Sequence, residues 1–266
     1  KFSVEKVPDW EAIDFDDSAW KKPVKVGTLG GGPWNLPGLR SATPVVQLNS
    51  ADISAPEGFV VEPVYTVPKE QGSWVSMATD PQGRIYASDQ GGAGLYRMTV
   101  QKNAPVIVEK VSVNELSKLS GAQGLLWAFD SLWFHRNGGH LYRLTDSNGD
   151  DQLDSMTEIP STTGGGEHGN HALILTEDEK GIFVDSGNHS KLAAHTASRV
   201  QSWAEDLLLP RMPDSNGHAN GIMAPGGWVT RLNPKTNAQV VHAIGFRNQY
   251  DIALNQAGDL FTYDAD

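Results

Sequence analysis

The feature that most constrains the fold of this chain is a short unit that recurs along it. Each copy has an apolar, β-branched segment, a turn with Asp or Asn and usually Gly, and a second apolar segment. The copies occupy residues 75–86, 171–183 and 251–261, with a weaker copy at residues 124–134. Each predicts a β-hairpin. Hairpins that recur at roughly 40–50 residues are typical of β-propeller blades, whereas a β-sandwich would not repeat one particular hairpin.

The glycines and the scarcity of helix patterns also favour an all-β fold. The 28 glycines are spread as turns between short β-branched and aromatic segments. Only residues 113–119 and 197–208 have helical spacing, the second with Trp203 and Leu207 on one face. Outer-strand segments follow two of the hairpins, at residues 94–98 and 139–144. We therefore predict a partial β-propeller of about four blades over residues 46–266.

Residues 1–45 have a different character. The segments at residues 14–20 and 30–34 have no copy elsewhere in the chain. The Asp-Asp-Ser-x-Trp pattern at residues 16–20 resembles the last strands of the galactose-binding-like jelly rolls that are attached to many carbohydrate enzymes. This resemblance implies that residues 1–45 are the jelly-roll-like tail of a preceding domain, or an ordered linker.

Composition excludes several classes of function. The chain has 21 Lys+Arg against 32 Asp+Glu, so it lacks the basic surface of a nucleic-acid binder. Its lack of cysteine excludes disulfides and thiolate sites within these residues. No apolar segment reaches the roughly 20 residues of a membrane-spanning helix, so no direct membrane insertion is expected. The chain begins with Lys1, and we expect a processed or excised part of an exported, periplasmic protein.

Three segments that could carry chemistry adjoin predicted inner strands. The glycine-rich segment 164–171 contains His168 and His171, and histidine can act as a base near neutral pH. Segment 245–251 offers the donors of Arg247 and Asn248, which suit a carboxylate or a quinone. Segment 121–126 contains Gln123. Taken singly, each also fits an ordinary role: a turn with surface histidines, an arginine bracing two blades, and an amide without function.

Together the three segments resemble a known family. Gln-Gly-Leu-Leu at residues 123–126, a histidine before an inner strand, and Gly-x-Arg-Asn at residues 245–248 are similar to the soluble quinoprotein glucose/sorbosone dehydrogenases. Those are six-bladed propellers that use pyrroloquinoline quinone (PQQ). The resemblance is closer still to the planctomycete and verrucomicrobial "membrane-bound dehydrogenase-like" propellers. The motifs that match are Gly-Glu-His-Gly-x-His at 166–171, Gly-Asn-His at 187–189, Glu-Asp-Leu-Leu-Leu-Pro-Arg at 205–211, Asn-Gly-His-Ala at 216–219 and Gly-Phe-Arg-Asn-x-Tyr-Asp at 245–251.

The resemblance implies a role for each matching residue. His168 would be the general base that takes a proton from a sugar hydroxyl, with His171 as its competitor. Arg247 would polarise the quinone carbonyl that accepts the hydride. Gln123 and Asn248 would hold the PQQ with Arg247. A Ca²⁺ near the quinone would take oxygens from the segment 263–266, Asp264 among them.

Two features depart from the family. Gln249 replaces the proline of the Arg-Asn-Pro motif. The cationic residues that clamp the PQQ carboxylates come from later blades of the family, and this sequence stops at Asp266. The implied fold is therefore better supported than the implied chemistry, and four blades of a six-bladed type predict a truncated ring.

A second calcium site is predicted from a loop with oxygen-bearing side chains at alternate positions. This loop resembles the first half of an EF-hand, although Asp151 replaces the expected glycine and Thr157 stands at position twelve. The alternative is a solvated acidic turn. The candidate ligands are Asp146, Asn148, Asp150, Gln152 and Asp154.

Two other groups of side chains have alternative explanations. His168, His171, His189 and His218 could form a transition-metal site, because imidazole binds Zn²⁺, Cu²⁺ and Fe. Most tryptophans are expected to pack between blades, although one or two could stack on sugar rings; they are Trp127, Trp133, Trp203 and Trp228.

These observations favour a PQQ-type dehydrogenase-like propeller that oxidises a carbohydrate or polyol and passes electrons to an acceptor such as a cytochrome c module. The first alternative is a Ca²⁺-dependent propeller hydrolase or lactonase. The second is a non-catalytic propeller that binds glycans or a protein partner.

Overall fold

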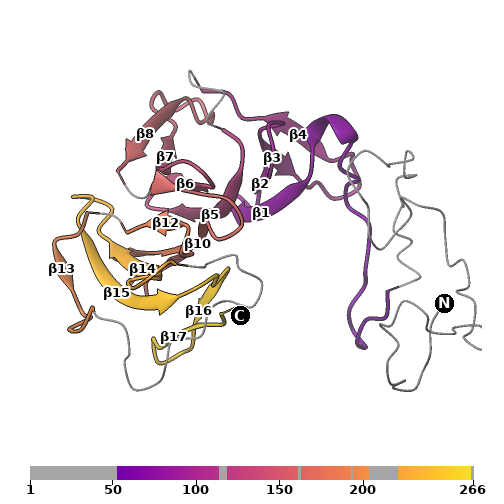
Figure 1. Cartoon of the computed structure of the whole chain (residues 1–266). Coiled ribbons are helices and arrows are strands. Elements are labelled where there is room, and N and C mark those ends of the chain that lie inside the picture. The colour runs from indigo at the N-terminus through magenta and orange to yellow at the C-terminus, as the bar shows by residue number, and fades with distance from the viewer. Residues whose placement is uncertain (1–52, 114–118, 161–162, 193, 204–220, 265–266) are drawn as a thin grey trace, which may run out of the picture. The chain divides into compact units, whose positions relative to one another are not determined.

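The computed structural model describes residues 53–113, 119–160, 163–192, 194–203 and 221–264 (Figure 1). The chain divides into two compact units, residues 1–63 and 64–266. The predicted N-terminal segment 1–45 lies outside the described residues, and residues 53–63 contain no helix or strand. All described strands belong to the second unit, together with the short 3-10 helix η2 (Lys69–Gln71).

The first two sheets of the second unit are four-stranded antiparallel meanders. The first consists of β1 (Trp74–Thr79), β2 (Ile85–Asp89), β3 (Leu95–Thr99) and β4 (Ile107–Lys110), in that order. The second consists of β5 (Ala122–Ala128), β6 (Ser131–Arg136), β7 (Leu141–Thr145) and β8 (Ser155–Ile159). In both sheets each strand pairs with the next in sequence, so the pairing is local.

The third sheet has the same core with insertions. Its strands are β10 (Asn170–Leu175), β11 (Ile182–Ser186), β14 (Gly227–Leu232) and β15 (Gln239–Phe246). A fifth, short strand, β13 (Ala197–Ser198), pairs parallel to β15. Two short strands, β9 (Thr163–Gly164) and β12 (Ser190–Lys191), pair beside this sheet, and β16 (Ile252–Leu254) forms a hairpin with β17 (Leu260–Thr262).

The arrangement of the sheets is that of a β-propeller. The inner strands β1, β5, β10 and β16 contact one another in succession, and each begins a new antiparallel sheet. Figure 1 shows the sheets following one another from indigo through orange to yellow. The prediction of an all-β propeller is confirmed, and the described residues form two four-stranded sheets, one five-stranded sheet and two two-stranded sheets.

Turn chemistry explains why the hairpin unit recurs. In the β1–β2 turn, the Asp80 carboxylate accepts the backbone N–H groups of Gln82 and Arg84 at 3.0 and 2.9 Å. In the β16–β17 turn, Asn255 Oδ1 accepts the N–H groups of Ala257 and Asp259, both at 2.9 Å. An Asp or Asn side chain thus closes each turn on its own backbone, which is the local rule the sequence pattern reflects.

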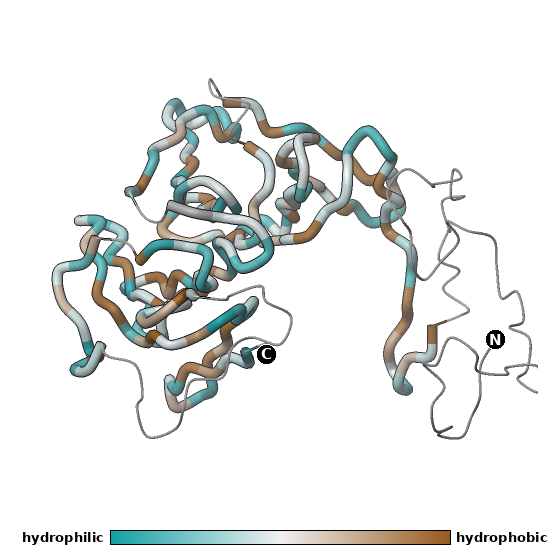
Figure 2. Tube along the Cα trace, viewed as in Figure 1, coloured by the Kyte–Doolittle hydropathy of each residue, from teal (hydrophilic) through white to brown (hydrophobic). Residues whose placement is uncertain are grey.

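Hydrophobic clusters join each sheet to the next. One lies between the first and second sheets, another between the second and third, and a third between the third sheet and the β16–β17 hairpin. Hydrophobic residues recur along the strands, whereas several turns are hydrophilic (Figure 2). Trp133 and Trp228 are fully buried, and their indole N–H groups donate to Ala128 O at 3.0 Å and Ser190 O at 3.3 Å. These two tryptophans pack between sheets as predicted.

The helix predicted over residues 197–208 is wrong where the structure describes it. Ala197–Ser198 is strand β13, and the Arg199 N–H donates to Val241 O of β15 at 2.8 Å. Ser198 Oγ also accepts the Val200 N–H at 2.9 Å, which favours a turn over a helix. Residues 204–208, and most of the helix predicted over residues 113–119, lie outside the described residues. Within the described part of the chain, no helix is long and apolar enough to cross a membrane.

One glycine sets the spacing between the second and third sheets. A Cβ at Gly124 on β5 would lie 2.3 Å from the main-chain oxygen of His171 on β10. Because backbone on both sides must then move, Gly124→Ala is expected to destabilise the fold by roughly 1–3 kcal/mol. Urea unfolding monitored by tryptophan fluorescence measures this change. Gly92→Ala is the matched control, since its Cβ would meet nothing within 4 Å, and equal midpoints for the two variants would contradict the prediction.

Candidate histidine site

The candidate site lies where three inner strands begin. Gln123 is the second residue of β5, His168 precedes β10, and Arg247 and Asn248 precede β16. Propeller inner strands run in the same direction, so their starts meet at one end. Hydrogen bonds connect these segments: Asn188 N–H donates to Arg247 O at 2.9 Å, and Tyr250 O–H donates to Gln123 Oε1. We call this group the histidine site: Gln123, His168, His171, Asn188, His189, Arg247, Asn248 and Tyr250.

Glycines position the loop that carries His168. Gly166 N–H donates to Asn137 Oδ1 at 2.9 Å, and Asn137 Nδ2 donates back to Gly166 O at 2.8 Å. A Cβ at Gly169 would lie 2.2 Å from Asn137 Oδ1, and one at Gly187 would lie 2.6 Å from His168 O. The glycine-rich segment therefore exists because three chain segments approach too closely for side chains.

His168 is fully buried and has a defined tautomer. Its Nδ1 lies 2.8 Å from Asn188 Oδ1, and its ring stacks on His189 with centroids 4.3 Å apart. An amide oxygen only accepts, so Nδ1 carries the hydrogen and Nε2 carries the lone pair. Burial lowers the pKa of His168; the Asn188 contact raises it, and His189 and Arg247 lower it further. His168 is therefore neutral at pH 7, with a basic Nε2.

His171 makes a different set of contacts. Its Nδ1 lies 2.5 Å from Gln249 O, its Nε2 lies 3.3 Å from Glu167 O, and its ring packs on Tyr250 with centroids 4.8 Å apart. Burial lowers its pKa as well. Both ring nitrogens face protein carbonyls, so His171 bridges β10 to segment 247–251. Which of the two histidines acts as a base stays a prediction.

Arg247 and Asn248 are held through their backbone. Their N–H groups donate to Asp264 Oδ2 and Oδ1, both at 2.7 Å. The Asp264 carboxylate thus fixes the segment that carries both side chains. A calcium ion on Asp264 stays a prediction, as do the roles of Arg247, Asn248 and Gln123 in cofactor binding.

The predicted EF-hand-like loop has internal partners for its carboxylates. Asp146 accepts the N–H groups of Asn148, Gly149 and Asp151 at 2.7–3.2 Å. Asp150 accepts Gln152 N–H, and Asp154 accepts Ser147 N–H and Oγ–H. The loop is also clamped to the first sheet, because Arg84 donates to the Asp151 carboxylate at 2.5 Å and Arg97 donates to Asp151 O at 2.5 Å. Calcium binding by this loop stays a prediction.

The transition-metal alternative finds no support among the described residues. No group of three His, Asp or Glu side chains in that part of the chain could hold a metal ion. The stacked rings of His168 and His189 lie 19° from parallel, so they do not converge on one ion as ligands. His218 lies outside the described residues.

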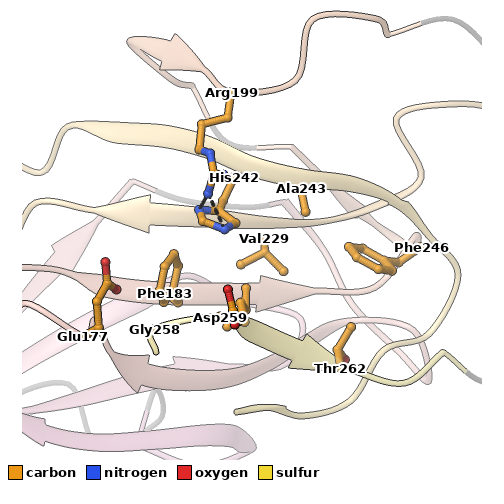
Figure 3. A pocket seen from close by; sticks show the side chains of 11 residues that line it. Glu177, Phe183, Arg199, Val229, His242, Ala243, Phe246, Gly258, Asp259 and Thr262 are labelled. Carbon is orange, nitrogen blue, oxygen red and sulfur yellow. Dashed lines mark hydrogen bonds between the residues drawn. The ribbon is translucent and has the colours of Figure 1, made fainter. Parts of the chain in front are cut away.

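A cavity of about 420 Å³ lies elsewhere, between the third sheet and the β16–β17 hairpin (Figure 3). Phe183, Val229 and Phe246 are among its apolar lining residues. Arg199 Nη1 lies 3.0 and 2.8 Å from the two ring nitrogens of His242 at its edge. No residue of the histidine site lines this cavity.

Sequence reasoning missed four residues of this region. Asn188 lay within a recognised motif, but its partner is 20 residues away. Tyr250 lies two residues after the Arg-Asn pair, yet its hydrogen bond to Gln123 spans 127 residues. Asp185 and His135 are buried polar residues within strand patterns, and nothing local marks them as unusual.

No protein-family model and no curated protein matches the chain. Solved structures of similar fold include the following three. They are the PQQ-bound aldose sugar dehydrogenase from Streptomyces coelicolor (16% identity, TM-score 0.47, 77% of this chain and 59% of that one), the Cps50 (Swd1) β-propeller domain from Myceliophteria thermophila (9%, 0.44, 77% and 52%) and a gluconolactonase from Xanthomonas campestris (14%, 0.32, 71% and 68%). The chain spans little more than half the length of the first two, and at these identities the similarity concerns the fold alone.

Proposed function

We propose that the histidine site oxidises a hydroxyl group of a carbohydrate or polyol, with His168 as general base. The observation that carries this proposal is the contact of His168 Nδ1 with Asn188 Oδ1 at 2.8 Å. It leaves the lone pair on Nε2, and the lowered pKa keeps the ring neutral at pH 7. A neutral, oriented imidazole is what removal of a hydroxyl proton requires.

The residues present fit an ortho-quinone cofactor such as PQQ. Gln123 and Asn248 supply amides and Arg247 a guanidinium, which are donors that suit quinone and carboxylate oxygens. Asn248 Oδ1 is buried and accepts no hydrogen bond from the described residues, so it could take an N–H donor of a ligand. PQQ would supply the two-electron acceptor that the oxidation needs.

Within that site each side chain has a defined task. His168 Nε2 takes the hydroxyl proton as the carbon–hydrogen bond breaks. Arg247 acts on His168 electrostatically and would stabilise negative charge on the accepting carbonyl. His189 stacks on one face of the His168 ring and helps to hold that ring in place. Asn188 holds the tautomer throughout.

The proposal extends to partners and place of action. Electrons would leave through an acceptor such as a cytochrome c module, and the protein would work in the periplasm or another exported compartment. A structural Ca²⁺ in the loop of residues 146–154 or at Asp264 belongs to the same proposal.

A dye-linked oxidation assay on the whole protein tests this function. Aldoses and polyols are supplied with and without added PQQ and Ca²⁺, and dye reduction is followed. Turnover that depends on PQQ is expected. Hydrolysis of lactones without any electron acceptor would replace the proposal with the hydrolase alternative. Glycan binding without turnover of either kind would overturn it in favour of a binding propeller.

A further inference from the structure

A buried carboxyl group lies beside the histidine site. Asp185 on β11 is fully buried, and neither of its carboxyl oxygens has a hydrogen-bond partner among the described residues. It follows Phe183 by two residues, so both side chains lie on the same face of the third sheet. Phe183 packs there against Val229 and Ile252. Asp185 therefore lies between the third sheet and the segment that leads into β16.

The neighbour of Asp185 on that segment is Gln249. Gln249 is also fully buried, and its Nε2 donates to Ser186 O at 2.8 Å and Trp228 O at 3.4 Å. Its Oε1 accepts no hydrogen bond from the described residues. Gly227 makes room for this side chain, because a Cβ there would lie 2.6 Å from Oε1.

Three buried acceptor oxygens, the two of the Asp185 carboxyl group and Gln249 Oε1, thus have no hydrogen-bond partner among the described residues, and the Asp185 carboxyl group interacts with the Gln249 side chain. Gln249 Nε2 donates to the main-chain carbonyls of Ser186 and Trp228, and it makes no hydrogen bond that would satisfy an Asp185 oxygen. A hydrogen on the Asp185 carboxyl group resolves the arrangement, because a carboxylic acid donates where a carboxylate only accepts.

We propose that Asp185 is a neutral carboxylic acid whose O–H donates to Gln249 Oε1, and that this acid–amide pair positions the His171 ring through Gln249 O. The main-chain oxygen of Gln249 lies 2.5 Å from His171 Nδ1. Asp185 thereby acts on the wall of the histidine site as a positioning residue. Its relevance to catalysis rests on the proposed function, whereas the pair itself does not.

The charges around Asp185 favour the neutral form. Burial raises its pKa well above the ordinary value, and the carboxylates of Asp251 and Asp264 raise it further. The Gln249 side chain and the Ser186 N–H act in the opposite direction with smaller effect. Ionisation would place an unpaired negative charge between two neighbouring carboxylates.

The Asp185→Asn variant tests the protonation of the pair. Its amide can donate to Gln249 Oε1 and stays neutral at every pH. A raised folded-state pKa gives stability that is greatest at low pH and is lost as pH rises toward that pKa. We therefore expect the Tm of Asp185→Asn, relative to that of the wild type, to rise as the pH increases from 5 to 9. Asp130→Asn, at an exposed position outside the histidine site and the loop of residues 146–154, is the control for the loss of a carboxylate charge.

A second measurement tests the positioning of His171. Long-range ¹H–¹⁵N spectra report the tautomer and Nδ1 shift of each histidine ring, and no turnover is involved. We expect the His171 signals to survive in Asp185→Asn and to shift in Asp185→Leu. A Tm difference that does not change with pH, or His171 signals that shift fully in Asp185→Asn, would overturn the proposal. The Tm and the His171 signals of Asp185→Asn test the acid–amide pair even if Asp185→Leu does not fold. An inactive wild-type enzyme would contradict only the proposed function and not the pair.

Discussion

His168→Ala is expected to lower the rate of dye-linked oxidation by about 10²–10⁴-fold while the protein stays folded and binds PQQ. This is the range that loss of a positioned general base costs. The alanine leaves no group to take the hydroxyl proton, whereas the amides of Gln123 and Asn248 remain. Steady-state turnover and PQQ binding by fluorescence, measured on the same preparation, separate loss of chemistry from loss of cofactor.

Two companion variants make the assignment specific. His195→Ala removes an exposed histidine outside the histidine site and should leave the rate unchanged. His171→Ala removes the contact to Gln249 O and should lower the stability of the fold more than the rate of the chemical step. If His171→Ala abolished turnover while His168→Ala did not, the base would be His171 and the assignment above would be wrong.

The Asn188→Asp variant tests the role of His168 through the pKa of its ring. A carboxylate 2.8 Å from Nδ1 would carry a full negative charge where the natural amide is neutral, so it would favour the imidazolium and raise the pKa of His168. In the variant, His168 would therefore be protonated, and unable to act as a base, at a higher pH than in the wild type. The acidic limb of the kcat/KM profile is therefore expected to move upward in Asn188→Asp. An unmoved limb would mean that His168 does not control the profile.

Local rules made most of the fold predictable. Asp80 and Asn255 close their turns on neighbouring backbone, so the hairpins can be recognised without knowledge of distant residues. The helix predicted over residues 197–208 failed where it begins because Ser198 bonds to Val200 and β13 pairs with β15, 43 residues away. Alternation of apolar residues could not indicate that pairing.

The site was predictable only in part, because its geometry depends on distant partners. The glycine-rich segment identified His168 as a candidate, but its tautomer depends on Asn188 in another turn. His171 could be separated from His168 only by its contact with Gln249, 78 residues away. Asp185 and His135 lie within ordinary strand patterns, and their buried, unsatisfied atoms become visible only once neighbouring sheets pack on them.

The second large effect is a loss of protein stability in acid, to which His135 is expected to contribute most. This residue of β6 is fully buried, its Nδ1 lies 3.0 Å from His171 O, and its Nε2 has no hydrogen-bond partner among the described residues. The carbonyl oxygen accepts, so Nδ1 carries the hydrogen of a neutral ring. Burial lowers the pKa of His135 to about 3; the contact with His171 O raises it slightly and the His171 ring lowers it.

Because the folded-state pKa lies below the unfolded value, the unfolded chain binds the proton first. The stability contribution is complete above about pH 6.5 and is lost as the pH falls toward 3, by up to about 1.4 kcal/mol per pH unit. Across that window the loss from His135 alone is on the order of 5 kcal/mol, which rivals the total stability of many domains. His168 and His171 add to the slope in the same direction, since burial lowers their pKa values too.

His135→Gln isolates this contribution. The glutamine amide can donate to His171 O but takes up no proton, so the variant should have a shallower fall of unfolding free energy between pH 7 and pH 4. Urea titrations at each pH give the slope, provided that the transition stays two-state. His195→Gln, at an exposed position, should keep the wild-type slope. A His135→Gln slope equal to that of the wild type would contradict the prediction, because it would mean that His135 takes up its proton at the same pH in the folded protein as in the unfolded chain.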